Sequence, residues 1–267
     1  MFVMLLVIDI GNTNTSLGVF DADSLAAHWR LTTDRARTVD EWGVLTRNLF
    51  ALTDLNFKSI KAIAVASVVP PLNFVLKRMA ETYFEISPLF IDHTVETGVP
   101  ILYEPPSDVG ADRIVDAVAA IQKYGAPCIV VDFGTATTFD AINAKGEYLG
   151  GVITPGITIS SDALFERAAK LPRVEIKRPP KVIGPATIEA MQSGLYHGYV
   201  GLVDGILKKM IEELGGKPKV IATGGLAPLI AKGSEFIELV DETLTLDGLR
   251  LVYERTLERS SVGTPSL

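Results

Sequence analysis

The chain has 267 residues, of which 48% are hydrophobic and 21% are charged. This composition is typical of a globular protein and excludes a disordered, collagen-like or fibrous chain. The net charge of −7 and the lack of a dense run of Lys and Arg argue against a nucleic-acid partner. A chain of this length is expected to form one large α/β domain or two lobes.

The N-terminal segment and the single cysteine bear on the cellular location. Met1–Ile8 is wholly apolar, but it lacks a basic flank and Asp9 ends it well short of a membrane span. Cys128 lies in an apolar run, which predicts a buried, inert thiol with no disulfide partner in the chain. We therefore expect a cytoplasmic protein without a membrane partner.

The first third of the chain begins with strands and continues with alternating helices and strands. Strands are expected at 3–10, 16–20, 26–32 and 60–68, with a helix that starts near Val39. This order predicts a parallel or mixed sheet. After an extended, Pro-containing stretch, apolar residues at helical spacing predict a helix over 109–123 that closes the first lobe.

A second copy of the opening pattern starts near residue 130. Val7–Thr15 and Val130–Thr138 both read apolar, apolar, Asp, apolar, Gly and then small, hydroxyl or amide residues, and Asp132 follows Asp9 by 123 positions (132 minus 9). A second strand is expected after each copy, and each half later has another buried strand that runs into a loop and a helix. The repetition predicts two structurally similar halves.

The second half also contains a long helical pattern, over 184–214. Gly194, Gly198, Gly201 and Gly205 recur every three or four residues and form one stripe along it. Each glycine costs about 1 kcal/mol relative to alanine in a helix interior, so close packing against the stripe is expected. An internal contact and a subunit interface both explain it. A last helix is expected over 244–257, before a loose tail.

Neither common phosphate-binding loop occurs in the chain: there is no Walker A sequence and no Gly-x-Gly-x-x-Gly after a strand. The two Asp-x-Gly hairpins are the remaining candidates, because glycine permits a tight turn whose amides and hydroxyls face phosphate oxygens. Asp9 and Asp132, at strand ends, could hold a hard cation. An ordinary hairpin turn is the alternative for either copy. Neutral hydrogen bonds would come from Asn12, Thr13, Thr15, Thr135 and Thr137.

Two further motifs could complete a ligand site. Thr223-Gly224-Gly225 lies between a buried strand and a helix and leaves room for a flat base, although a simple strand-end turn explains it equally well. Gly110-Ala111-Asp112-Arg113 opens the helix of the first lobe, where the helix dipole stabilises a carboxylate or a bound anion. Asp112 is a candidate catalytic base, or only a first-turn acid paired with a nearby cation.

Taken together and in order, these motifs closely resemble those of the type III pantothenate kinases over nearly the whole chain. The Gly-Ala-Asp-Arg element is the most specific of them. The matching segments are 9–13, Tyr103, 110–113, 132–137, 150–156, Thr187, 223–225 and 244–249.

The resemblance implies an α/β fold of two actin-like, ribonuclease H-like lobes, each a mixed five-stranded sheet flanked by helices, with the ATP cleft between them. We place the lobes at 1–117 and 118–267. The implied activity is that of a phosphotransferase with an alcohol acceptor: ATP-dependent phosphorylation of pantothenate to 4'-phosphopantothenate, the first step of coenzyme A biosynthesis. The family is similar in being homodimeric, with the acceptor site near the subunit interface.

By the same resemblance, each motif residue has an implied role. Asp112 is the proton acceptor, and Asp132 binds a monovalent cation, K⁺ or NH₄⁺, while Mg²⁺ accompanies ATP. The residues implied for ATP are Asp9, Ile10, Gly11, Asn12, Thr13, Asn14, Thr15, Ser16 and Thr135. Those implied for pantothenate are Tyr103, Gly110, Ala111, Asp112, Arg113 and Thr187.

Two other functions are compatible with the hairpins. One is a non-catalytic nucleotide-binding regulator, and the other is a kinase or phosphohydrolase of the same superfamily that acts on a different small acceptor, such as a sugar or polyphosphate. The candidate base at Asp112 and the lack of a basic surface argue against the regulator. Only Tyr103 to Arg113 and Thr187 favour pantothenate over another acceptor, and they do so by resemblance alone.

Overall fold

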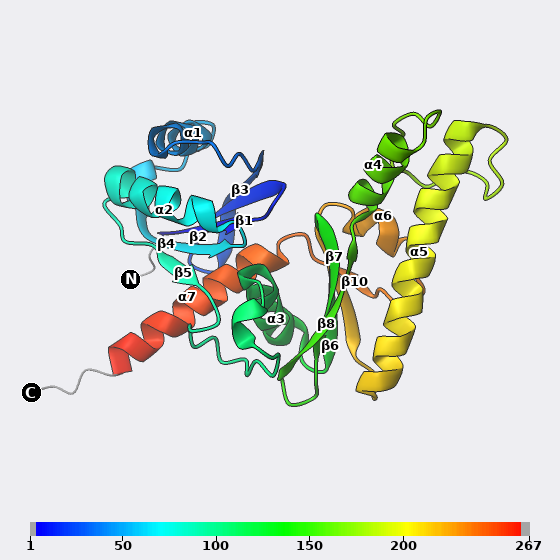
Figure 1. The fold of residues 1–267 in the computed structure, drawn as a ribbon. Coiled ribbons are helices and arrows are strands. Elements are labelled where there is room, and N and C mark those ends of the chain that lie inside the picture. The colour runs from blue at the N-terminus through cyan, green and yellow to red at the C-terminus, as the bar shows by residue number, and fades with distance from the viewer. Residues whose placement is uncertain (1–3, 263–267) are drawn as a thin grey trace, which may run out of the picture. The chain divides into compact units, whose positions relative to one another are not determined.

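The computed structural model describes residues 4–262, which form two compact units (Figure 1). The first unit contains the chain up to Ala119 together with the segment from Leu244, and the second contains Ala120–Thr243. In the described range, no helix is both long enough and apolar enough to span a membrane.

The first unit is built on a mixed five-stranded sheet, as expected. Its strands are β1 (Met4–Ile10), β2 (Asn14–Asp21), β3 (Ser24–Thr32), β4 (Ile60–Ser67) and β5 (Leu89–Ile91), in the order β3-β2-β1-β4-β5. β1 pairs antiparallel with β2 and parallel with β4. Short helical turns lie at η1 (Phe57–Ser59), η2 (Ala80–Phe84) and η3 (Pro106–Asp108).

One face of this sheet carries the larger side chains and is covered by two helices. Leu6, Ile8 and Ile10 alternate along β1 and belong to one buried cluster with side chains of α1 (Val39–Ala51) and α2 (Pro70–Met79). Trp42 of α1 is fully buried there. Since alternate residues of a strand share a face, the apolar run of β1 buries both faces, which explains its central position.

The other face has small residues on β2 and β4 and receives the C-terminal helix α7 (Leu244–Val262). A Cβ atom on Gly18 of β2 would lie only 3.1 Å from Leu246 Cδ1, and one on Gly248 would lie 2.1 Å from the carbonyl oxygen of Val115 in α3 (Ala111–Tyr124). Glycine at these positions lets α7 pack closely against β2 and α3. The expected lobes placed residues 244–267 with the second lobe, whereas α7 packs on the first sheet.

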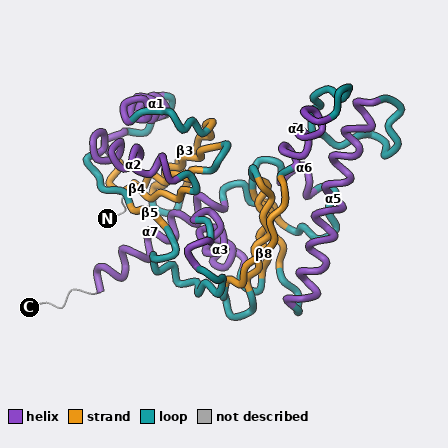
Figure 2. Tube along the Cα trace, in the orientation of Figure 1, coloured by secondary structure: helices purple, strands orange, loops and turns teal. Residues whose placement is uncertain are grey.

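The second unit repeats the topology of the first. Its strands are β6 (Cys128–Phe133), β7 (Ala136–Ile142), β8 (Tyr148–Pro155), β9 (Lys219–Thr223) and β10 (Leu239–Val240), in the order β10-β9-β6-β7-β8. In both units the first strand is central, between the second and the fourth. The two sheets are visible as separate groups of strands in Figure 2. The predicted duplication is thus confirmed at the level of strand order.

Three helices pack on one face of the second sheet: α4 (Ile157–Arg167), α5 (Thr187–Leu214) and α6 (Ala227–Ala231). Ile129, Val131 and Phe133 of β6 form a buried cluster with α5 side chains that include Tyr199 and Val203. Cys128 is buried, and burial raises the pKa of its thiol to about 12, so the thiol stays protonated at neutral pH. The prediction of a buried thiol is confirmed.

The two hairpins differ in length by one residue. In the first, the last paired residues are Ile10 and Thr15, and in the second they are Phe133 and Thr137. The second turn is therefore one residue shorter, so that Thr137, and not Thr138, takes the place of Thr15. Both threonines are fully buried. The predicted repeat, in which the two segments were aligned without a gap, is therefore out of register by one residue after Gly134.

A buried ion pair ties the end of α3 to the segment after β10 within the second unit. Lys123 Nζ and Tyr124 Oη donate to Asp241 Oδ2 over 2.6 and 2.7 Å, and Asp241 is only 8% exposed. Burial alone would raise the pKa of Asp241, but the hydrogen bonds from Lys123 and Tyr124 outweigh it and hold the pKa below its ordinary value.

We expect Asp241→Asn to lower the free energy of unfolding at pH 7 by about 2 kcal/mol, because it removes charge-assisted bonds from a buried group. Since the folded-state pKa lies below the unfolded-state value, the stabilisation is full above about pH 4 and is lost as the pH falls through the folded-state pKa. Urea unfolding of both proteins between pH 7 and pH 3 should therefore show a difference that shrinks in acid. The exposed Asp54→Asn is the matched control, and a difference independent of pH would contradict the assignment.

Candidate functional site

The first hairpin forms a closed turn at the end of the central strand. Gly11 N donates to Asn14 O over 3.0 Å, and a Cβ atom on Gly11 would lie 3.0 Å from the same oxygen. Asp9, at the end of β1, is partly buried, while Asn12 and Thr13 are exposed at the tip. The turn thus exposes backbone and small polar groups at its tip, and their contact with a ligand stays a prediction.

Thr33, the residue after β3, fastens this turn through three hydrogen bonds. Its N–H donates to Thr13 O over 2.9 Å and its hydroxyl donates to Gly11 O over 2.7 Å. The hydroxyl of Thr15 lies 2.9 Å from Thr33 Oγ1 and must be the donor, because the Thr33 proton is already used. The sequence analysis did not identify Thr33. Its only signal is its place, directly after a third strand that runs back beside the hairpin.

Arg35 also reaches the hairpin, and the sequence analysis missed it as well. Its Nη2 donates to Asn12 Oδ1 over 2.9 Å, across 23 positions of sequence. Both side chains are exposed. A guanidinium group therefore stands at the tip of the turn.

The carboxylate of Asp112 lies at the same edge of the first sheet as this hairpin. Val68, the residue after β4, donates from its N–H to Ile10 O over 3.0 Å. A Cβ atom on Gly110 would lie 3.2 Å from Val68 Cγ1 and 2.4 Å from Asp112 Oδ1, so the carboxylate covers Gly110. Asp112 is partly buried, and its Oδ1 accepts from Arg113 N over 2.8 Å. One unit thus brings the Asp9 hairpin and the 110–113 motif together.

In the second unit, the shorter hairpin lies against the glycine turn that follows β9. A Cβ atom on Gly224, which has φ +89°, would lie 2.5 Å from Asp132 Oδ1 and 2.8 Å from Phe133 N. A side chain at this position would therefore collide with the hairpin. Gly156 N donates to Thr135 O over 3.2 Å, in the place where the first unit uses Thr33. Thr135 is exposed at the tip.

A buried carboxylate stands next to Asp132 on the second sheet. Asp140 and Tyr148 are each 1% exposed. Asp140 accepts from the Tyr148 hydroxyl over 2.6 Å and from the Thr138 hydroxyl over 3.1 Å. Thr138 pairs directly with Asp132 across the strands, so their side chains share a face. Because the Thr138 proton is given to Asp140, its oxygen can only accept there or bind a cation.

These oxygen atoms fit a hard cation. Asp132 and the Thr138 hydroxyl are oxygen donors of the kind that such ions prefer. The described part of the chain holds no group of three or more His, Cys, Asp or Glu side chains that could bind a metal ion. A cation beside Asp132 would consequently depend on hydroxyl, backbone and phosphate oxygens for the rest of its ligands.

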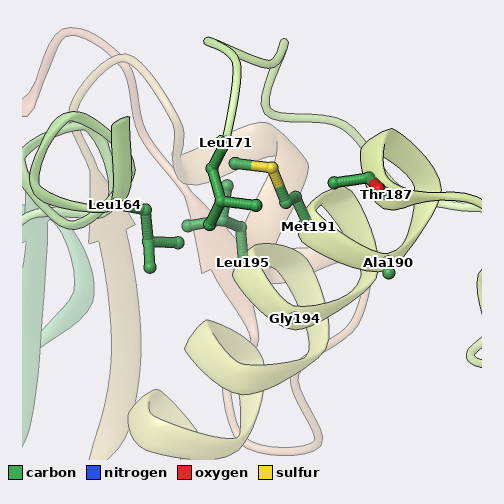
Figure 3. A pocket seen from close by; sticks show the side chains of 7 residues that line it. All are labelled: Leu164, Leu171, Thr187, Ala190, Met191, Gly194 and Leu195. Carbon is green, nitrogen blue, oxygen red and sulfur yellow. The ribbon is translucent and has the colours of Figure 1, made fainter. Parts of the chain in front are cut away.

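Thr187, the first residue of α5, lies at the edge of an apolar hollow in the second unit (Figure 3). The hollow has a volume of about 480 Å³. Leu164 of α4, Leu171 and the α5 residues Met191 and Leu195 form much of its wall. Thr187 therefore belongs to a concave surface, together with Ala190 and Gly194.

The predicted site residues are thus divided between the two units. The first unit holds Asp9–Ser16, Gly110–Arg113 and the partly buried Tyr103, which lies in the loop before η3. The second unit holds Asp132, Thr135 and Thr187. Within the first unit, the candidate base Asp112 lies at the same sheet edge as the candidate phosphate-binding turn.

Comparison with known proteins identifies the family of this chain. A relative from Koribacter versatilis (strain Ellin345), called a type III pantothenate kinase, is 60% identical over 262 residues, covering 94% of this chain and 96% of its own. Among solved structures, MreB 5 of Spiroplasma citri bound to AMPPNP is 11% identical with a TM-score of 0.55, covering 98% of this chain and 99% of its own.

Another solved structure, a Campylobacter jejuni protein assigned to the Baf family of transcriptional activators, is 21% identical with a TM-score of 0.55 and covers 95% of this chain and 99% of its own. Both structural likenesses show the fold alone, and they agree with the actin-like lobes that were predicted. The sequence model of the type III pantothenate kinase family matches residues 5–209. With that match and the relative at 60% identity, this chain belongs to the type III pantothenate kinase family.

Proposed function

We propose that this chain uses ATP to phosphorylate the primary hydroxyl of pantothenate, which yields 4'-phosphopantothenate in the first step of coenzyme A biosynthesis. The observation that carries the chemistry is the position of Asp112, whose carboxylate lies at the same sheet edge as the Asp9 hairpin. Phosphoryl transfer needs an acceptor hydroxyl held in line with the γ-phosphate and a group that takes its proton.

Asp112 is the proton acceptor in this proposal. The bond from Arg113 N orients its carboxylate, and Gly110 beneath it has no side chain that could block a substrate. Because Asp112 stands in the first turn of α3, the helix dipole favours its ionised form, which is the form that accepts a proton. A positioned base of this kind contributes about 10² to 10⁴ in rate.

ATP would be bound by Asp9–Ser16 and by Thr135. The Gly11 turn offers N–H and hydroxyl groups, and Thr33 keeps it from opening. Such a turn can bind phosphate without a lysine. Binding of ATP between the two lobes stays a prediction.

For the acceptor, we propose contacts with Tyr103, Gly110–Arg113 and Thr187. The hollow beside Thr187 has aliphatic walls, and these suit the branched hydrocarbon part of pantothenate. A regulator that only binds nucleotide would release no ADP on addition of pantothenate. A kinase of another acceptor would release ADP only with that acceptor.

We expect Asp112→Asn to lower kcat by about 10² to 10⁴ and to leave the Kd for ATP within about twofold, because the amide keeps the shape but cannot take the proton. A coupled ADP-release assay and calorimetric titration with ATP measure the two effects. Asp108→Asn, an exposed acid in the preceding turn, is the control that should behave like the wild type. Turnover near the wild-type value in Asp112→Asn would remove this residue from the mechanism.

Mg²⁺ is proposed to accompany ATP, and a monovalent cation, K⁺ or NH₄⁺, to bind at Asp132. When bound, these cations would offset phosphate charge. The hydroxyl network of Thr138 and Asp140 would hold the Asp132 side of the site in place.

Asp132→Asn should raise the K⁺ concentration for half-maximal activity by about tenfold or more, since it removes the formal charge of the site. The same variant should lose the increase in Tm that K⁺ gives to the ATP-bound wild type. Titration with KCl against tetramethylammonium chloride at equal ionic strength separates ion binding from screening. An unchanged K⁺ dependence by both measures would reject Asp132 as the ligand.

We further propose a homodimer that uses the glycine stripe of α5. Gly194, Gly198, Gly201 and Gly205 are exposed, and a Cβ atom on any of them would meet no atom within 4 Å. The stripe therefore does not serve a contact inside the described chain. One exposed apolar residue lies beside the stripe: Val182 is 65% exposed, and its carbonyl oxygen accepts a hydrogen bond from the Ser193 hydroxyl of α5.

A bulky Gly201→Leu change should shift the protein from dimer to monomer in sedimentation velocity, because a helix of a second copy could no longer approach closely. Arg47→Leu, on the exposed side of α1, is the control for added apolar bulk. In a monomer, by contrast, Gly201→Ala should only stabilise the helix, by about 1 kcal/mol. A dimer that survives Gly201→Leu would exclude the stripe as the interface.

A cytoplasmic location and the lack of a nucleic-acid partner stay predictions.

A further inference from the structure

We infer that Arg35 binds phosphate oxygens of ATP at the tip of the first hairpin and supplies the cationic side chain that the hairpin motif itself lacks. The inference rests on the proposed function, because it takes the hairpin as the phosphate-binding element. Arg35 lies outside every motif by which the family was recognised.

The segment that carries Arg35 is short and is fixed at both ends. Thr33 is bonded to the hairpin backbone, as described above, and Asp34 Oδ1 accepts from Ala36 N over 3.0 Å. At the other end, Thr38 and Glu41 form a reciprocal cap at the start of α1. Arg35 is therefore held close to the turn by its backbone, and only its side chain has to adjust to a ligand.

The direction of the Arg35 side chain is set by Asn12. One of its terminal nitrogens donates to Asn12 Oδ1, at the exposed tip between Gly11 and Asn14. A guanidinium has five N–H donors in a planar fork, and this bond uses one. In the described part of the chain, Arg35 makes no ion pair with a carboxylate. Its charge and most of its donors thus stand at the turn without being neutralised.

The neighbouring arginine shows what a structural role looks like here. Arg37 is partly buried and stacks over Trp42, with its guanidinium carbon 5.0 Å from the ring centroid. That contact packs the segment against α1. Arg35 is exposed and has no ring partner among the described residues. Of the two arginines, therefore, Arg35 is the one that could meet a ligand.

Electrostatics favours a cation at this place. A triphosphate brings several negative charges to a turn flanked by Asp9 and Asp34, in a chain of net charge −7. Without a local positive group, those carboxylates would oppose ATP binding. The fork of arginine suits phosphate oxygens because it can donate two parallel hydrogen bonds, which lysine cannot do. The second hairpin has no equivalent, since Gly156 stands in the place of Thr33 and leads directly into α4.

Calorimetric titration of the full-length protein with ATP, ADP and adenosine tests the inference. We expect Arg35→Ala to raise the Kd for ATP by about tenfold or more and to leave the Kd for adenosine unchanged, because adenosine has no phosphate. The Kd of Arg35→Lys for ATP should lie between those of the wild type and Arg35→Ala, because lysine keeps the charge and loses the planar fork of donors. Arg47→Ala, an exposed arginine on α1, is the matched control and should bind ATP like the wild type.

A merely structural role predicts different results. If Arg35 only steadied the turn through Asn12, the salt dependence of ATP binding would be the same in Arg35→Ala as in the wild type, whereas a direct phosphate contact makes it weaker in the variant. An equal salt dependence, or a Kd for ATP within twofold of the wild type, overturns the inference. A wild-type protein that does not bind ATP would instead overturn the proposed function, and Arg35 with it.

Discussion

In each lobe, one backbone hydrogen bond joins the tip of the hairpin to the residue that follows the third strand, and the shape of the turn depends on it. In the first lobe Thr33 N donates to Thr13 O, and in the second Gly156 N donates to Thr135 O. The donor is in both cases the residue that leaves the third strand. Because the third strand pairs along the whole second strand, this bond ties the tip of the turn to the body of the sheet. The amides of the turn are thereby held in one orientation, which the proposed phosphate site requires before the ligand arrives.

The placement of Asp112 depends on packing at a distance from the site. α3 begins at Ala111, and its position is fixed where Gly248 of α7 meets the carbonyl oxygen of Val115. α7 in turn lies on small residues, among them Gly18 and the Ala62, Ala64 and Ala66 face of β4. The last helix of the chain therefore supports the candidate base, although more than 100 residues of the second lobe separate the two in sequence. Its packing also explains why α7 belongs to the first unit.

Much of this architecture could be read from the sequence, because strong local patterns specified it. The apolar runs that became β1 and β6, the Asp-x-Gly turns and the helical spacing of α3 are all signals within about 15 residues. Their order then predicted two similar halves. The type of each element was clearer than its ends, and α5 begins at Thr187 rather than at Gly184.

The features that escaped prediction depend on contacts between distant segments. No local motif marks Thr33 or Arg35 as neighbours of residues 11–13, because the pairing of β2 with β3 brings them there. The loss of one turn residue in the second hairpin is visible only in the pairing of Phe133 with Thr137. β8, with glycines at positions 150 and 151, also lacks the continuous apolar pattern of a buried strand. The motifs could therefore be recognised from residue chemistry alone, whereas the residues that contact them could be identified only from the pairing of the strands.

The two lobes have the same topology, but one equivalent position on their second strands holds very different residues. Val7 pairs with Gly18 in the first sheet, and Val130 pairs with Asp140 in the second. Glycine there admits Leu246 of α7, so the first lobe uses this face for packing. Asp140 instead places a buried carboxyl group there, which accepts hydrogen bonds from Tyr148 and Thr138, and this makes the same face polar beside Asp132. A buried carboxylate is costly unless it is hydrogen-bonded, so the hydroxyls of Tyr148 and Thr138 are what allow Asp140 to occupy this buried position.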